Sequence, residues 1–382
     1  MNKKAYLDFY EKHQIIPVRQ DKSDMAKHFN RRGNLFKQIG IPPALLKGKS
    51  VIEFGPGSGD NAIYTASLKP DCYVLVDANS ASISELHKKL DEGYFGEVVP
   101  EICNSNISDY QDNRRFEVVF CEGVIPNQEC PSAFLKKISS FVAPGGVMCI
   151  TTMSPISCLA EVCRRVIRPF FPQEINCAVG DAVKFFKDDL LSLTGMSRFH
   201  DDWVLDNILH PWGESLFFSI PTAIETISDN FDFYRSSPSF LMDWRWYKSI
   251  NGSEFGTNEM AKNAYSFNSL FLIDYRINPA EITLPAHSGW VSLEDDCKEA
   301  YEAHMEIWLN EDVDAIYTKF LPLMGRISSK LANLLPITAC SLQDFISGMH
   351  EMKTKGLQAD FKSFRTWFGR GQQYVSFIRK YK

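Results

Sequence analysis

The chain of 382 residues carries a formal net charge of −6, and 45% of its residues are hydrophobic, which gives enough apolar material for about two or three globular units. This acidic balance argues against a general nucleic-acid binder, because affinity for polyanions is built from lysine and arginine. The ten cysteines form neither a C-x-x-C pair nor a Cys/His zinc spacing, and the sequence contains neither a signal peptide nor an apolar run of about 18 residues. We therefore expect a cytoplasmic protein without a metal site, a nucleic-acid partner or a membrane partner.

Residues 1–45 have apolar side chains at helical spacing, and Gly40 with the following prolines ends the second of two predicted helices. We expect this segment to form a helical lid that closes over a bound ligand. Each of its polar side chains could equally lie on a solvated helix face. The side chains that could reach a substrate are Tyr10, His13 and Arg32.

From residue 46 short apolar runs alternate with helical patterns. The runs are SVIEF, CYVLVDAN, EVVPEIC, FEVVFCEG and GVMCITTM. Strands separated by helices of this length require right-handed crossovers, which produce a mostly parallel sheet covered on both faces. We therefore predict a doubly wound α/β core over residues 46–171, completed by about residues 230–290.

The second half of the chain is less regular. Residues 172–229 are rich in aromatic side chains, and we expect them to form a helical insertion that covers the substrate. Residues 291–382 predict a helical C-terminal region with apolar stripes, one of which contains Cys297, Tyr301 and Met305. These stripes would pack against the sheet or against a second subunit, so a homodimer through the C-terminal helices is one expected arrangement.

A glycine-rich stretch, VIEFGPGSGDN, follows the first predicted strand and contains Gly55, Gly57 and Gly59. Such a loop lets a ligand approach the N–H groups of the next helix at the carboxyl edge of the sheet. A dinucleotide fingerprint, G-x-G-x-x-G, requires a further glycine where this chain has Asp60. The sequence therefore favours a nucleoside ligand of another kind, with a nicotinamide enzyme and a turn that binds nothing as alternatives.

Two acidic residues flank this loop. Asp77 ends the second predicted strand, where an acid can accept both hydroxyls of a ribose. Glu53 precedes the first glycine of the loop, where a carboxylate is better suited to an ammonium group than to a pyrophosphate. Together the two acids favour a nucleoside that carries a cation.

With these motifs in this order, residues 50–155 resemble a class I S-adenosylmethionine-dependent methyltransferase. VIEFGPGSGDN resembles the first motif of that family, YVLVDAN resembles the second, and CEGVIPN with the later APGGVMCITT resembles the fourth-strand and fifth-strand block. The resemblance implies a Rossmann-like fold and S-adenosyl-L-methionine as the cofactor.

By motif position, the resemblance also implies a role for each cofactor residue. The methionine part would face the loop, the ribose would bind Asp77, and the adenine would lie near Asn106, which replaces the acid of many relatives but can still accept a hydrogen bond. The implied cofactor residues are Glu53, Gly55, Gly57, Gly59, Asp77, Asn79, Asn106, Ile107, Glu122, Gly123 and Val124.

Methyl transfer from a sulfonium is an in-line displacement, and a hydroxyl acceptor usually needs a general base. The insertion segment RFHDDWVLDNILHPW offers His200, Asp201 and His210 as catalytic candidates, with Trp203 as a wall for a substrate ring. The same DDW could instead be a helix start with an aspartate cap, and His200, Asp201 and His210 could instead be metal ligands, although we predict no metal.

We predict methyl transfer to an oxygen of a small or medium polar metabolite, for which a sugar or glycan intermediate is one candidate. The alternatives are a protein or RNA methyltransferase, which would need an open basic cleft, and a non-catalytic cofactor-binding scaffold.

Overall fold

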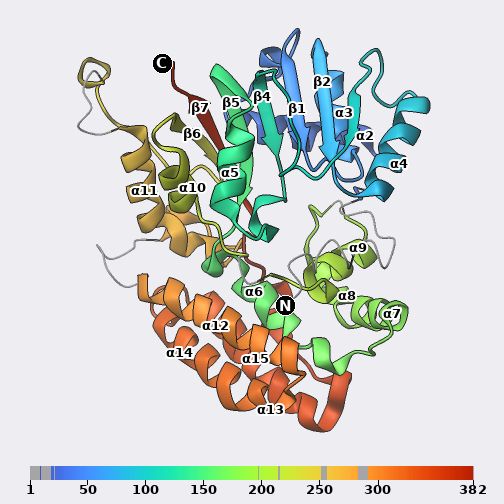
Figure 1. Ribbon diagram of the computed structural model, residues 1–382. Helices are drawn as coiled ribbons and strands as arrows, with labels where there is room; N and C mark the ends of the chain where they lie inside the picture. Colours follow the sequence, from blue (N-terminus) through green and yellow to red (C-terminus); the bar gives the residue numbers. More distant parts are fainter. Residues whose placement is uncertain are drawn as a thin grey trace. The chain divides into compact units, whose positions relative to one another are not determined.

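The computed structural model describes residues 9, 19–20, 22–196, 198–213, 216–250, 256–282 and 291–381 (Figure 1). The chain divides into two compact units. The first contains Met1–Met153, Pro211–Tyr265 and Gln372–Lys382, and the second contains Ser154–His210 and Ser266–Gly371. The predicted insertion, residues 172–229, contributes to both units.

The first unit contains a seven-stranded sheet in the order β3-β2-β1-β4-β5-β7-β6 (Figure 1). Its strands are β1 (Ser50–Phe54), β2 (Cys72–Asp77), β3 (Glu101–Asn104), β4 (Phe116–Cys121), β5 (Val142–Thr152), β6 (Phe231–Ser237) and β7 (Gln373–Arg379). Strands β1 to β5 pair in parallel, and β7 pairs antiparallel with both β5 and β6. The predicted doubly wound, mostly parallel α/β core is confirmed.

Helices cover the sheet of the first unit. They are α2 (Met25–Gln38), α3 (Asp60–Ser67), α4 (Ser80–Asp91), α5 (Pro131–Ser139), α10 (Ile220–Ile227) and α11 (Thr257–Asn268), of which the last ends at the boundary with the second unit. On one face, Tyr73 and Phe120 form an apolar cluster with Phe36 of α2 and Tyr64 of α3. Because both faces are covered, the strands are almost continuously buried, as parallel strands require.

The end of the chain differs from the predicted helix. Residues 373–379 form β7, which inserts between β5 and β6. Val375, Ser376 and Phe377 are all fully buried, as expected for a strand inside a sheet that is covered on both faces. The C-terminal strand therefore belongs to the sheet unit, and not to the helical region that precedes it in sequence.

Strand β6 is one of the two edge strands of the sheet, and a side chain of α11 binds part of its free edge. The N–H of Phe233 donates to Asn258 Oδ1 at 2.6 Å, and Asn258 Nδ2 donates to the carbonyl of Phe231 at 2.9 Å. A register shift between Phe233 and Arg235 interrupts the strand nearby. One amide of α11 thus satisfies two main-chain groups that a further strand would otherwise satisfy.

The second unit is built largely of helices. They are α6 (Leu159–Arg165), α7 (Ile175–Phe185), α8 (Lys187–Ser192), α9 (His200–Val204), α12 (Val291–Asn310), α13 (Val313–Ala315), α14 (Leu321–Leu331) and α15 (Pro336–Lys355). Helix α14 packs against α12 and α15, and the predicted stripe residues Cys297, Tyr301 and Met305 are buried. Among the described helices of both units, none is long and apolar enough to cross a membrane.

A buried ion cluster lies in the second unit. Asp189 accepts hydrogen bonds from Arg164 Nε and Arg365 Nη1, both at 3.0 Å, and the Arg164 and Asp189 side chains are 0% and 1% exposed. Further donors of Arg164 bind the main-chain carbonyls of Trp367 and Phe364, and its guanidinium lies 3.9 Å from the ring centre of Phe368. This cluster joins α6, α8 and the segment before β7 within one unit.

Candidate functional site

The glycine loop connects β1 directly to α3 at the carboxyl edge of the sheet. Gly55, Gly57 and Gly59 have φ values of 71°, 55° and 76°, in the left-handed region that favours glycine. A Cβ on Gly55 would lie 2.3 Å from Val124 Cγ2. Backbone conformation and the space left by Val124 therefore both require glycine at position 55.

The carboxylate of Asp77 is bound by this loop. The N–H of Gly57 donates to Asp77 Oδ2 at 3.0 Å, and the N–H of Asn79 donates to Asp77 Oδ1 at 2.8 Å. Burial raises the pKa of Asp77, while the N–H groups of Asn79 and Gly57 oppose that rise. A carboxylate has about four acceptor positions, so Asp77 can still accept two hydroxyl groups of a ligand.

Asn79 adds an unused donor beside Asp77. Its Oδ1 accepts from the N–H of Ala81 at 2.9 Å and so caps α4. Its Nδ2 is buried and has no hydrogen-bond partner among the described residues. A buried donor of this kind normally finds a partner, and an oxygen or a ring nitrogen of a nucleoside would supply one.

The predicted adenine residues follow β3. Ile107 is buried, whereas Asn106 is exposed and its Oδ1 accepts from the N–H of Ser108 at 3.1 Å. The amide oxygen that was predicted to meet the adenine therefore also holds a local turn. Adenine contact by Asn106 and Ile107 stays a prediction.

Glu122, Gly123 and Val124 follow β4 directly. Gly123 has a φ of 74°, and its N–H donates to Thr151 Oγ1 at 2.7 Å, which fixes this turn to the end of β5. Glu122 forms a two-pronged ion pair with Arg32 of α2: Nη1 donates to Oε2 at 2.8 Å, and Nη2 donates to Oε1 at 2.7 Å. Burial lowers the pKa of Arg32, but its pairing with Glu122 outweighs burial and raises that pKa above the ordinary value.

Glu53 lies in β1, on the same face of the sheet as Glu122. Its Oε2 accepts a hydrogen bond from the Tyr73 hydroxyl at 2.7 Å, and only 4% of the residue is exposed. Burial and the nearby Glu122 carboxylate raise the pKa of Glu53 to about 7, while Tyr73 and Arg32 oppose the rise. Glu53 is therefore a buried carboxyl group whose ionisation depends on its neighbours near neutral pH.

Asp60, the first residue of α3, connects the loop to the N-terminal segment. Its Oδ2 accepts from the N–H of Gln20 at 2.8 Å, and its Oδ1 lies 2.9 Å from Lys22 Nζ and 3.4 Å from Lys89 Nζ. The sequence identified Asp60 only as the residue at the position where a dinucleotide fingerprint has its last glycine. An acid in the first turn of a helix is the signal that could have marked it as an anchor.

Apart from Arg32 in α2 of the first unit, the predicted acceptor-side residues lie in the second unit or outside the described residues. His200 begins α9, so Asp201 lies in the first turn of that helix and not at its cap. Trp203 and His210 are buried; the Trp203 ring lies 5.9 Å from that of Phe368, and the His210 carbonyl accepts from Arg165 Nη2 at 2.8 Å. Tyr10 and His13 lie outside the described residues.

No group of three His, Cys, Asp or Glu side chains that could bind a metal occurs among the residues whose placement is described. Catalytic roles for His200, Asp201 and His210, and substrate contacts of Trp203 and Arg32, stay predictions.

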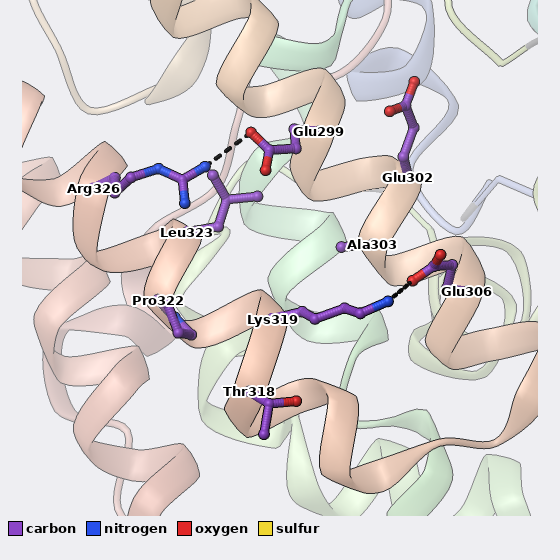
Figure 2. Close-up of a pocket in the computed structure, with 9 residues that line it drawn as sticks. All are labelled: Glu299, Glu302, Ala303, Glu306, Thr318, Lys319, Pro322, Leu323 and Arg326. Atoms are coloured by element: carbon purple, nitrogen blue, oxygen red, sulfur yellow. Dashed lines mark hydrogen bonds and ion pairs between the residues drawn. The ribbon is translucent and has the colours of Figure 1, made fainter.

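A surface groove between α12 and α14 belongs to the second unit (Figure 2). Two exposed ion pairs cross it, Arg326 with Glu299 at 2.8 Å and Lys319 with Glu306 at 2.6 Å. None of the predicted site residues lines this groove. The charged side chains of the two ion pairs are exposed, as on an ordinary helix surface.

Residues 23–172 match the family model described as a methyltransferase domain. No curated protein matches the chain. Among solved structures, the chain is similar to the N-methyltransferase NodS from Bradyrhizobium japonicum, in complex with S-adenosyl-L-homocysteine, with 13% identity over 38% of this chain and 74% of that one, and a TM-score of 0.31.

Magnesium protoporphyrin IX methyltransferase from Synechocystis, with bound S-adenosylmethionine, shares 15% identity over 40% of this chain and 72% of that one, with a TM-score of 0.30. PKMT2 from Rickettsia typhi shares 16% identity over 64% of this chain, with a TM-score of 0.45. This chain spans 50% of the length of the Rickettsia structure.

Proposed function

We propose that the protein is an S-adenosylmethionine-dependent methyltransferase that methylates an oxygen atom of a small or medium polar metabolite, such as a sugar or glycan intermediate. The match of residues 23–172 to a methyltransferase domain supports this proposal. The observation that carries the donor side is the Asp77 carboxylate, which Gly57 holds beside the unpartnered Nδ2 of Asn79. A ribose needs acceptors for its hydroxyl protons and can itself accept from Asn79.

The residues at the loop fit S-adenosyl-L-methionine in a defined order. Asp77 and Asn79 would bind the ribose, Glu53 the ammonium group, and Asn106 with Ile107 the adenine, while Gly123 and Val124 would border the methyl end. When bound, the cofactor supplies an electrophilic methyl group on a sulfonium. The protein then contributes orientation of the acceptor and exclusion of water.

The acceptor side of the proposal rests on the composition of the insertion. We propose His200 or His210 as the base that removes the acceptor proton, Asp201 as the group that orients it, and Trp203 as a wall for a ring. Tyr10 and His13 would bind polar groups of the acceptor, whereas the guanidinium of Arg32, the third residue predicted to bind substrate, already binds Glu122. A cytoplasmic location and a homodimer formed through the C-terminal helices belong to the same proposal.

Titration calorimetry with S-adenosylmethionine, S-adenosylhomocysteine and NAD tests the donor site. Both sulfur nucleosides should bind, and NAD should not. Asp77→Ala should weaken their binding by about 1.5–3 kcal/mol, because it removes hydrogen bonds to a charged acceptor. Asp91→Ala removes an exposed acid at the end of α4 and should leave affinity unchanged. Failure of the unsubstituted protein to bind either sulfur nucleoside would refute the donor assignment.

A labelled-cofactor screen of cell extract tests the acceptor. Label should enter the small-molecule fraction, and His200→Gln or His210→Gln should lower kcat more than it changes cofactor affinity. Label that enters protein or RNA instead would overturn the proposed acceptor class. Tight cofactor binding without transfer to any fraction would favour the scaffold alternative.

A further inference from the structure

Two carboxylates with little exposure to solvent lie at the ends of neighbouring parallel strands. Glu53 of β1 is in register with Phe120 of β4, and Glu122 follows Phe120 by two residues, which places it on the same face of the sheet. Side-chain exposure of Glu122 is 10%. Like charges so placed destabilise each other unless cations or protons compensate them.

Arg32 supplies the positive charge for one of these carboxylates. Both of its terminal nitrogens bind the two oxygens of Glu122, and 5% of its side chain is exposed. The guanidinium also lies 5.2 Å from the ring centre of Phe36, which stacks on Phe120 at 5.3 Å. Arg32 is therefore fixed at the strand end by the helix that carries it and by the rings beneath it.

This geometry leaves Glu53 with a weaker partner. The terminal nitrogens of Arg32 are used by Glu122, and Glu53 accepts instead from the neutral hydroxyl of Tyr73. A neutral hydrogen bond compensates a buried carboxylate less than a cation does. Within the described part of the site, the negative charge of Glu53 is incompletely balanced.

We propose that Arg32 is a positioning residue for the methyl donor: by neutralising Glu122 it leaves Glu53 as the carboxylate that receives the ammonium group of the donor. This inference rests on the proposed function. It departs from the sequence-based prediction of Arg32 as a substrate-binding side chain, because the guanidinium already binds Glu122. It also links α2 to donor binding, since this helix carries Arg32.

The ionisation of Glu53 should then respond to both members of the ion pair. Arg32 lowers the pKa of Glu53, whereas Glu122 raises it. A cationic ligand binds the ionised form, so donor affinity should rise with pH through the pKa of Glu53. The titratable and charged groups that face Glu53 are Arg32 of α2, Tyr73 and Asp77 of β2, Cys121 and Glu122 at the end of β4, and Cys149 of β5.

The test is the pH dependence of S-adenosylhomocysteine binding, measured by calorimetry on the full chain. Arg32→Met should move the midpoint upward by about one pH unit, because a cation that lowers the pKa of Glu53 is lost. Glu122→Gln should move it downward by a similar amount, because the guanidinium then faces Glu53 without a competing anion. The double variant should have a midpoint close to that of the unsubstituted protein. Arg32→Lys, which keeps the positive charge, should shift the midpoint only slightly.

A merely structural role for the pair would weaken binding in both single variants without opposite shifts of the midpoint. Equal or absent shifts in a protein that binds the ligand would overturn the role of Arg32 and leave the proposed function intact. No binding by the unsubstituted protein at any pH would instead refute the proposed function, and this inference with it. If Arg32→Met does not fold, the downward shift in Glu122→Gln and the retained midpoint in Arg32→Lys decide the question.

Discussion

Two charge clusters, one in each unit, have opposite ratios of acidic to basic side chains. Among the described residues of the sheet unit, Glu53 and Glu122 face a single guanidinium, that of Arg32. In the helical unit, Arg164 and Arg365 share the single carboxylate of Asp189. One cluster therefore has an excess of negative charge, and the other has an excess of positive charge.

The two clusters differ in the groups that compensate their excess charge. Around Arg164, main-chain carbonyls and the ring of Phe368 accept the remaining charge, so that cluster is complete within the chain. Around Glu53, the hydroxyl of Tyr73 is the partner, and the pKa of Glu53 rises to about 7. A complete cluster stabilises a fold, whereas an incomplete one can gain a charged ligand.

The largest expected effect comes from breaking the complete cluster. Asp189→Ala leaves Arg164 buried without its counter-ion and should lower the free energy of unfolding by about 3–5 kcal/mol. Urea unfolding measures this loss. A change below about 1 kcal/mol would show that carbonyls and rings alone can hold the guanidinium, and the contrast between the units would disappear.

A second variant tests how closely Val124 packs against the glycine loop of the sheet unit. Gly55→Ala combines a φ of 71° with a contact of 2.3 Å to Val124 Cγ2 and should cost about 2–4 kcal/mol of unfolding free energy. Gly93→Ala is the matched control, since Gly93 has a φ of 76° but no neighbouring atom within 4 Å; it should cost about 1–2 kcal/mol. Val124→Ala in the Gly55→Ala background should recover the difference, and equal losses in the two single variants would argue against the contact.

The incomplete cluster predicts a gain of stability. The pKa of Glu53 rises from 4.5 to about 7 on folding. The stabilisation that protonated Glu53 gives to the folded state is therefore fully present below pH 4.5 and is lost as the pH rises through 7. Glu53→Gln cannot ionise and can still accept from Tyr73, so above pH 7 it should stabilise the unliganded protein by about 1–3 kcal/mol. Thermal unfolding at several pH values measures this, and a destabilised variant at every pH would contradict it.

The smallest effect is expected at an exposed pair of the helical unit. Glu306→Ala removes the partner of Lys319 at the groove of Figure 2, where both side chains are more than half exposed. Solvent screens such pairs, so unfolding free energy should change by no more than about 0.5 kcal/mol. A loss comparable with that of Asp189→Ala would mean that burial does not separate the two kinds of ion pair.

The sequence could predict those site residues that belong to short motifs at the ends of consecutive strands. The glycine loop, Asp77 and Glu53 lie at ends of consecutive strands, so strand order alone places them on one edge. The pair of Arg32 with Glu122 joins residues 90 positions apart, and no short-range pattern encodes it. The strand β7 was missed because the preceding region is helical, and because a strand of seven residues becomes recognisable only through its pairing with β5 and β6.

The Asn258 side chain also bears on how two copies of this chain could meet. An open strand edge attracts the backbone of another molecule, but at Phe231 and Phe233 the amide of Asn258 already makes both hydrogen bonds. An incoming strand would have to break as many hydrogen bonds at these positions as it formed there. Growth of the sheet from one molecule into the next through this part of β6 therefore brings no gain in hydrogen bonding.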